Sequence, residues 1–212
     1  MTWAQRHAEL IILICIGIAY AVAAYERNAI WKSDLFLWDD AIKKSPLKAR
    51  PYNNLGLAYK ERGSIDEAIP LFTKSVALNR EVALSPDAAK PHYNLALCYL
   101  EKGWTDRAMV EFDRTIRINP YCAEAYNNLG VSYFKKDRVD TAISKFQHAI
   151  RINPDHADAH YNLGIAYGSK GQYDLAFKEI KTAKKLLDSG TKWQKIAGDI
   201  KGGVAPAVSG HP

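Results

Sequence analysis

The chain has 212 residues, a formal net charge of +6 and 48% hydrophobic residues, so its length fits one elongated domain and little else. The basic residues are spread along the chain and form no arginine-rich stripe with exposed aromatics, which argues against a nucleic-acid partner. The sequence shows no Gly-rich phosphate loop, nucleophile–base pair or suggestively spaced carboxylate pair, and we therefore expect no enzyme and no cofactor.

An uncharged and mostly apolar run extends from Leu10 to Tyr25, with charged residues on both sides. It is apolar on all faces and approaches the roughly 17–25 residues that span a bilayer. We therefore predict a membrane anchor or signal-anchor helix within residues 1–25, with membrane contact through residues 8–25. Two alternatives remain open. Ala21-Val22-Ala23 has the A-x-A form of a signal cleavage site, and the run could also be a buried helix of the domain.

A leading half repeat is predicted over residues 26–48. Ser33-Asp34 has the form of a helix N-cap, and Pro46 ends the segment. Trp38 and Ala41 occupy a large and a small position that return later in the chain. We expect a single helix that covers the open end of the repeats which follow it.

The sequence Asn-Leu-Gly-x-x-Tyr, or a near copy of it, then occurs four times. The last three copies are 34 residues apart, and the first gap is 40 residues. Apolar residues recur at i, i+4 and i+7 in both halves of each repeat, which predicts two antiparallel helices joined by a tight turn. Such a repeat cannot bury its apolar face alone and stacks on its neighbours. The four predicted repeats are residues 49–88, 89–122, 123–156 and 157–188.

Side-chain size gives the repeated positions their roles. Gly56, Gly130 and Gly164, with Ala96 in the second repeat, stand where two helices must approach closely. The whole pattern resembles the tetratricopeptide repeat (TPR), and the resemblance covers residues 49–188. It implies an all-α fold, namely a right-handed α-solenoid of TPR helical hairpins, which in this chain follows the predicted N-terminal transmembrane helix.

Beyond the repeats, a helical spacing continues through Trp193, Ile196, Ala197 and Ile200, and Gly190 precedes it. We predict a short amphipathic capping helix over residues 189–201, because the terminal repeat of a solenoid needs a cover. Residues 202–212 are small and rich in Gly and Pro, and we predict a disordered tail there.

His156 and His160 are four residues apart, with Asp155 and Asp158 nearby, a spacing that could hold a metal on one helical face. The two histidines straddle a predicted loop and a helix start, and His160 occupies a packing position of the repeat. We therefore assign them a structural or solvated role and predict no metal site.

The candidate binding site is the inner side of the first helices. Asn54, Asn94, Asn128 and Asn162 occupy the same position in every repeat. Stacking would align them as a ladder of amides along a concave groove, and an amide can pair with a peptide backbone. Alternatively, these asparagines simply bond neighbouring backbone. Beside the ladder lies an apolar and aromatic row suited to a hydrophobic partner segment: Leu57, Leu97, Val131, Ile165, Leu100, Phe134, Tyr93 and Tyr161.

These features predict a membrane-tethered scaffold or adaptor that binds a protein or peptide segment in the groove. Alternatives are an accessory subunit that presents protein to a membrane glycosyltransferase, and a self-assembling structural module.

The side of the membrane on which the repeats lie is predicted from a second resemblance. The stretch from Glu26 to Lys32, then Leu37-Trp38 and Lys44-Ser45-Pro46, is similar to the junction between membrane helix and repeats in transmembrane-and-TPR membrane proteins. That family includes protein O-mannosyltransferases. In that family the repeats lie on the non-cytoplasmic side, and this chain has a single apolar run. Together they imply a single-pass protein of the cell (inner) membrane with extracytoplasmic repeats, which could belong to a membrane-protein complex. Lysines and arginines after the apolar run instead favour the cytoplasmic side, and export after signal cleavage is a further alternative.

Overall fold

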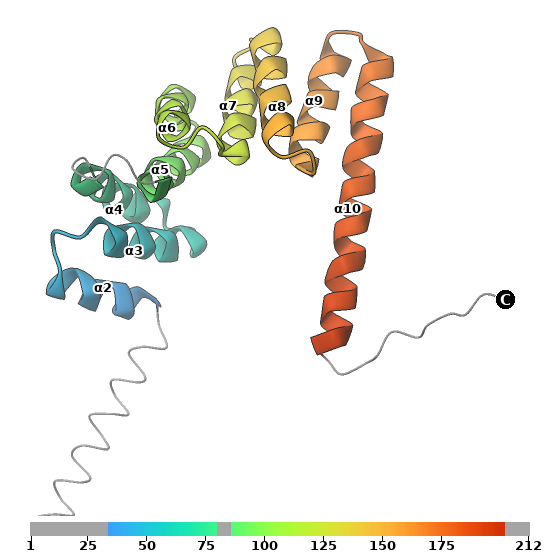
Figure 1. The fold of residues 1–212 in the computed structure, drawn as a ribbon. Coiled ribbons are helices and arrows are strands. Elements are labelled where there is room, and N and C mark those ends of the chain that lie inside the picture. Colours follow the sequence, from blue (N-terminus) through green and yellow to red (C-terminus); the bar gives the residue numbers. More distant parts are fainter. Residues whose placement is uncertain (1–33, 80–85, 202–212) are drawn as a thin grey trace, which may run out of the picture. The chain divides into compact units, whose positions relative to one another are not determined.

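The computed structural model describes residues 34–79 and 86–201, with side chains up to Asp188. Within these residues every regular element is helical: nine α-helices and one short 3₁₀-helix, η2 (Pro86–Ala88). The all-helical fold is therefore confirmed for this part of the chain (Figure 1). The chain divides into an N-terminal module, residues 1–82, and a C-terminal module, residues 83–212.

The N-terminal module contains α2 (Asp34–Lys44), α3 (Ala49–Glu61) and α4 (Ile65–Leu78). α2 packs against α3, and α3 packs against α4. A Cβ atom at Gly56 would lie 2.8 Å from Cε1 of Phe72, so a larger residue would push the two helices of this hairpin apart. α2 stands where the leading half repeat is predicted.

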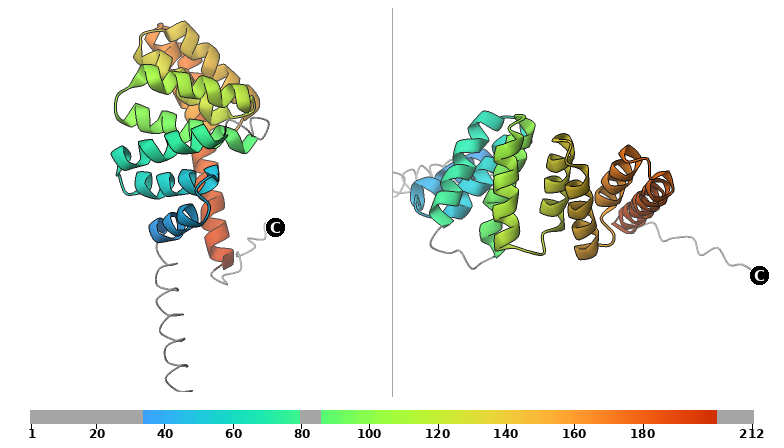
Figure 2. Two further views of the ribbon diagram at one scale, coloured as in Figure 1. Left: turned by 90° about the vertical axis from the view of Figure 1, so that its left-hand side faces the viewer. Right: turned by 90° about the horizontal axis from the view of Figure 1, so that it is seen from above.

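The C-terminal module contains three helical hairpins. They are α5 (Ala89–Glu101) with α6 (Thr105–Ile118), α7 (Ala123–Lys135) with α8 (Val139–Ile152), and α9 (Ala157–Ser169) with α10 (Tyr173–Lys201). Each helix contacts the next one along the chain, and α7 also contacts α9. Figure 2 shows these hairpins side by side from two further directions. The hairpins therefore stack as the repeat period predicts.

The core of this module alternates small and large residues. Phe112 and Phe146, at the same position of two repeats, are 0% and 1% exposed. A Cβ atom at Gly130 would lie 2.6 Å from Cε1 of Phe146, and one at Gly164 would lie 2.7 Å from Cγ1 of Ile180. Carbon atoms in good contact are roughly 3.5–4.0 Å apart. Glycine therefore permits the close helix approach that the sequence predicts at these positions.

Each hairpin turn contains one residue in the left-handed conformation. Gly63, Gly103 and Gly171 have φ angles of 76°, 75° and 73°, and Asp137 fills the same position with a φ of 57°. Aspartate is one of the few residues other than glycine that visits this region routinely. This explains how the third repeat makes the same turn without a glycine.

One boundary differs from the sequence prediction. α10 runs without a break from Tyr173 to Lys201, so residues 189–201 extend the second helix of the last repeat and are not a separate capping helix. An internal glycine such as Gly190 weakens a helix by only about 1 kcal/mol, which a long helix tolerates.

None of the described helices combines the length and the apolar composition needed to cross a bilayer. The predicted anchor at residues 8–25 and the predicted tail at residues 202–212 lie outside the described residues.

Candidate partner-binding face

The first helices of the C-terminal module place most of the predicted site residues on one layer of neighbouring helices. We call this set the inner face: Tyr93, Asn94, Leu97 and Leu100 on α5, Asn128, Val131 and Phe134 on α7, and Tyr161, Asn162 and Ile165 on α9. Asn54 and Leu57 lie on α3 of the other module, so each module presents its own share of the predicted row.

The asparagines of the inner face link successive repeats. Nδ2 of Asn128 donates to Oη of Tyr93 at 3.1 Å, and Nδ2 of Asn162 donates to Oδ1 of Asn127 at 2.9 Å. In both cases the acceptor stands one residue before the equivalent asparagine of the preceding repeat. One N–H of each amide is thus engaged inside the module, with a side chain and not with the backbone. The ladder therefore holds neighbouring first helices together.

The remaining two asparagines have other surroundings. Asn94 is buried, with 9% of its surface exposed. Asn54 accepts a hydrogen bond from Nδ2 of Asn53 at 3.2 Å within the N-terminal module. The four amides are therefore not equivalent, although the sequence places them at the same position.

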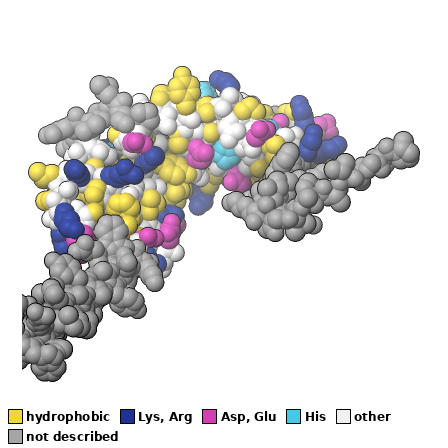
Figure 3. Space-filling model, turned by 60° about the horizontal axis from the view of Figure 1, so that its bottom comes forward, with side chains coloured by type: hydrophobic (Ala, Val, Ile, Leu, Met, Phe, Trp, Pro, Cys, Tyr) yellow, Lys and Arg dark blue, Asp and Glu magenta, His cyan; other side chains and the backbone are white. Residues whose placement is uncertain are grey.

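The apolar residues of the inner face differ in exposure from helix to helix. Tyr161 and Ile165 on α9 are 51% and 40% exposed. Leu97 on α5 and Val131 on α7, at the position of Ile165, are half-buried against the core of their own repeats. The apolar surface is consequently largest on α9. On the side of the molecule drawn in Figure 3, apolar side chains lie among charged ones of both signs.

Tyr93 is held as a neutral phenol. Burial raises the pKa of Tyr93 to about 12, and the neighbouring Cys122 and Glu124 act in the same direction. Its ring lies 5.9 Å from the ring of Phe112 at an interplanar angle of 59°. Burial also raises the pKa of the Cys122 thiol, and neither Cys122 nor Cys98 forms a disulfide bond. A thiol with a raised pKa is a poor nucleophile, so Cys122 is not an activated thiol.

Two buried histidine–carboxylate pairs join first and second helices of alternate repeats. Nδ1 of His92 lies 2.6 Å from Oε2 of Glu111, and Nδ1 of His160 lies 2.6 Å from Oε2 of Glu179. The other ring nitrogen of His160 lies 3.0 Å from the carbonyl oxygen of Pro154. The structural role assigned to His160 is thus supported by its contacts. The described residues contain no group of three or more His, Cys, Asp or Glu that could hold a metal.

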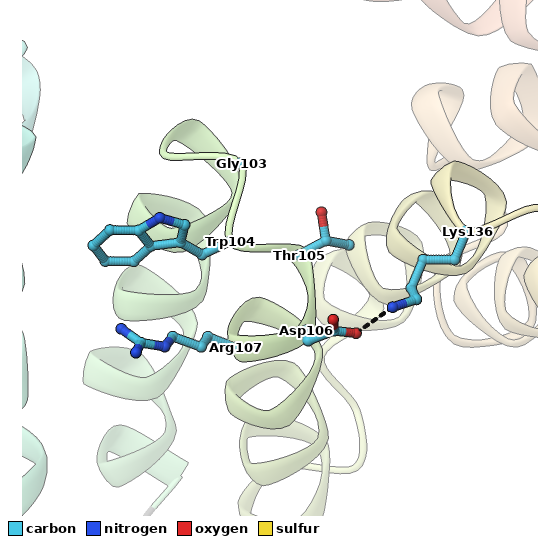
Figure 4. A pocket seen from close by; sticks show the side chains of 6 residues that line it. All are labelled: Gly103, Trp104, Thr105, Asp106, Arg107 and Lys136. Carbon is cyan, nitrogen blue, oxygen red and sulfur yellow. Dashed lines mark hydrogen bonds and ion pairs between the residues drawn. The ribbon is translucent and has the colours of Figure 1, made fainter.

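Sequence reasoning missed an open depression of about 590 Å³ at the turn between α5 and α6. It is lined by Gly103, Trp104, Thr105, Asp106, Arg107 and Lys136. In Figure 4 the Trp104 and Arg107 side chains extend to one side, with the guanidinium carbon 5.0 Å from the indole ring centroid. On the other side Lys136 reaches Asp106 at 2.5 Å. The charges of this lining are therefore engaged with their neighbours.

Comparison with known families supports the class of fold. Models of the tetratricopeptide repeat match residues 47–119 and 157–186, and a TPR repeat model matches residues 132–171. The chain therefore contains tetratricopeptide repeats, as its period and its small residues predict.

Individual solved structures share the fold. A crystal structure of MamA is similar at 27% identity, with 74% of this chain and 89% of that chain covered and a TM-score of 0.65. YrrB, described as a TPR protein with an unusual peptide-binding site, is 24% identical, with coverages of 80% and 84% and a TM-score of 0.59. BtubC from P. vanneervenii is 19% identical, with coverages of 79% and 76% and a TM-score of 0.68.

A match among curated proteins is limited in extent. Protein O-mannosyl-transferase Tmtc3 of Drosophila melanogaster is 25% identical over 81 residues, which are 38% of this chain. The chain spans 8% of the length of that protein.

Proposed function

We propose that the chain is a scaffold or adaptor that binds a segment of a partner polypeptide along the inner face. The observation that carries this proposal is a row of equivalent apolar side chains, Leu97, Val131 and Ile165, on neighbouring first helices. The hydrogen bonds from Asn128 and Asn162 fix the spacing of these helices, so the row exists before a partner arrives. Pre-organisation of this kind lowers the entropy cost of binding.

The free energy that each buried side chain contributes decides how many contacts such a site needs. Fully burying an exposed Ile or Leu side chain contributes roughly 1.5–3 kcal/mol, and the residues of the inner face are already partly buried. A micromolar complex requires about 8 kcal/mol. One helix cannot supply this, so the partner segment must cross α5, α7 and α9 together. An extended or helical segment with several apolar side chains meets that requirement.

The test uses two exposed apolar residues with similar exposure. Peptides are selected from a displayed library of random 12-residue sequences on the full-length chain in detergent. We expect Ile165→Glu, on the inner face, to weaken binding of the selected peptides by about tenfold or more, because a carboxylate enters the apolar row. Leu175→Glu changes a residue that is 43% exposed on α10 and should leave binding unchanged. Equal effects of the two substitutions would contradict the proposal.

We further propose that residues 8–25 tether the repeats to a membrane, with the repeats on the extracytoplasmic side. The support is the apolar run and its flanking sequence. Alkaline extraction of cell membranes should leave the chain in the pellet, and protease added to spheroplasts should degrade the repeats. Release by alkali would contradict the tether, and protection from protease would contradict the orientation. Recovery of a soluble chain that begins after Ala23 would favour export after cleavage.

A second candidate function is an accessory subunit that presents protein to a membrane glycosyltransferase. The match to Tmtc3 over 81 residues favours it. Because only 8% of that protein is covered, the glycosyl transfer itself would have to come from another chain. Co-purification of a polytopic membrane protein with the full-length chain, lost in Ile165→Glu, would support this function over a general adaptor.

A further inference from the structure

The second helix of each internal repeat in the C-terminal module turns one side toward the repeat that follows. In α8 the residues on this side pack against a core containing Leu163 and Ala166 of α9: Val139, Ile143 and Ile150. In α6 the equivalent positions pack against a core containing Ala125 and Leu129 of α7: Met109 and Ile116. These positions therefore form the seam between successive repeats.

α10 carries the same seam, and no described residue covers it. Tyr173 and Phe177, which are equivalent to the seam residues of α8, are 75% and 70% exposed. Ile180 is 37% exposed, whereas Phe146 at the same position of α8 is 1% exposed. We call Tyr173, Phe177, Ile180 and Lys184 the end face. An exposed aromatic and aliphatic row of this kind is a surface that binding would bury.

An ion pair joins the first helix of each of the last two repeats to the second helix of the repeat before it, and so fixes how the two helices are aligned. Lys136, just after α7, pairs with Asp106 of α6 at 2.5 Å, and Lys170, just after α9, pairs with Asp140 of α8. The next aspartate of this series, at the same spacing of 34 residues, is Asp174 at the start of α10.

The other end of the end face carries the opposite charge. Lys184 stands where α8 has Ile150, so a cation replaces an apolar residue of the seam. Covering a lysine without a counter-charge is costly, because its ammonium group loses water and gains no partner. A helix that covers this end must therefore bring a carboxylate.

We propose that the end face binds an amphipathic α-helix of another protein, which lies on α10 as the first helix of a fifth repeat would. The apolar stripe of that helix covers Phe177 and Ile180. A basic residue near its C-terminus pairs with Asp174, as Lys136 and Lys170 pair with the equivalent aspartates. An acidic residue in its N-terminal half meets Lys184. Helix-in-groove recognition by spaced apolar anchors is a common mode of partner binding.

This chain does not offer a suitable helix for the end face among its described residues. Residues 189–201 continue α10 as one helix and so cannot lie back on it. Residues 202–212 contain no acidic residue, lysine or arginine. In a second copy, the described first helices are already packed in hairpins of their own. The end face has an apolar centre with Asp174 near one end and Lys184 at the other, so it is complementary to an amphipathic helix that carries the opposite charges, and we assign that helix to another protein.

The test uses a stapled helical peptide with the α9 sequence of residues 157–170 and the change Ala159→Glu. The peptide thus carries the lysine of Lys170 at its C-terminal end and a carboxylate in its N-terminal half. Binding to the full-length chain in detergent is followed by fluorescence anisotropy. We expect saturable binding that weakens about tenfold or more in Phe177→Asp, because a charge enters the centre of the apolar row. Phe177 is 70% exposed, so this substitution leaves the fold intact, which circular dichroism checks.

A charge exchange separates recognition from a general loss of apolar surface. The Lys184→Glu variant should bind the Ala159→Glu peptide more weakly than the parent chain does. The same variant should bind a peptide with Ala159→Lys more tightly than the parent does. Leu175→Asp, on α10 but off the end face, and Ile165→Glu, on the inner face, should leave peptide binding unchanged. This second control keeps the proposal independent of the proposed function.

Three results would overturn the proposal. The first is peptide binding that Phe177→Asp does not change. The second is a dimer of the full-length chain, measured by light scattering, that Phe177→Asp dissociates, since a second copy would then be the occupant. The third is binding that requires removal of residues 1–33, which would make a segment of this chain the occupant.

Discussion

The histidine–carboxylate pair of the second repeat supports a quantitative prediction. Glu111 has a side chain that is 8% exposed, and its two oxygens contact Nδ1 of His92 at 2.6 Å and Nη1 of Arg114 at 2.7 Å. The third repeat solves the same packing problem differently. There Tyr126 and Lys145 occupy the equivalent positions, with the ammonium group 5.9 Å from the ring centroid, and His148 stacks on that ring at 5.1 Å.

The single substitutions His92→Tyr and Glu111→Lys should each destabilise the fold. Removing the hydrogen-bond partner of a buried carboxylate costs about 3–5 kcal/mol when the remaining charge has no other partner. In His92→Tyr the half-exposed Arg114 still contacts Glu111, so we expect the free energy of unfolding to fall by about 2–3 kcal/mol. We expect a similar fall for Glu111→Lys, because an ammonium group is then buried beside His92. The double variant copies the third repeat and should lie within about 1 kcal/mol of the parent. This corresponds to a coupling energy of at least about 3 kcal/mol.

The assay is guanidinium unfolding of the full-length chain in detergent, followed by circular dichroism at 222 nm. The triple variant that adds Arg114→His completes the copy and should match or exceed the double variant in free energy of unfolding. If the double variant lost the sum of the two single losses in free energy of unfolding, the reasoning would be refuted. Such a result would show that each residue stabilises the fold through its own shape and not through the contact between His92 and Glu111.

Three further predictions concern the inner face and the turns. Asn128→Ala should lower the free energy of unfolding by about 1 kcal/mol, and Tyr93→Phe should add little to that loss, because both remove the same hydrogen bond; additive losses in chemical denaturation would contradict this. The raised pKa of Tyr93, about 12, means that its contribution to stability is full below a pH of about 10 and is lost as pH rises toward 12. The absorbance at 295 nm of Tyr93→Phe, subtracted from that of the parent over a pH titration, isolates the ionisation of Tyr93. This ionisation should occur near pH 12, and a transition near pH 10 would contradict the prediction. Asp137→Gly should raise the free energy of unfolding by about 0.5 kcal/mol, because it relieves a left-handed aspartate, and a loss in thermal unfolding would show that the aspartate makes a compensating contact.

The sequence predicts the hairpins well because small and large side chains return at the same positions of each repeat, and these sizes indicate where helices pack closely. A position that is glycine in three repeats, such as Gly130, requires a large neighbour that comes close, and Phe146 fills that place. The periodic apolar positions predict both the helices and their stacking. The break at Gly190 was a weaker signal, because one glycine does not end a helix that its neighbours favour.

The partners of the polar residues could not be read from the sequence in the same way. Asn128 bonds Tyr93, and Asn162 bonds Asn127, in each case 35 residues back along the chain. A pattern read within one repeat does not show a contact between two repeats. The histidine pairs left a detectable trace, because a His and a Glu 19 residues apart occur in both the second and the fourth repeat. A comparison of repeats for recurring pairs of charged residues would have found them.

If a partner binds the inner face as proposed, the variable positions of that face would set its specificity, and the constant ones would not. The asparagine position is constant, and the structure gives Asn128 and Asn162 the task of joining helices, so constancy there reflects architecture. The position one helical turn past the apolar row varies instead: Leu100, Phe134 and Gly168. A Cβ atom at Gly168 would meet only Cβ of Ala176, at an ordinary 3.8 Å, so packing does not require a glycine there. The absence of a side chain at Gly168 instead leaves open surface on α9, the helix whose inner-face apolar residues are the most exposed. A partner segment should therefore place its largest side chain on α9 and smaller ones against Leu100 and Phe134.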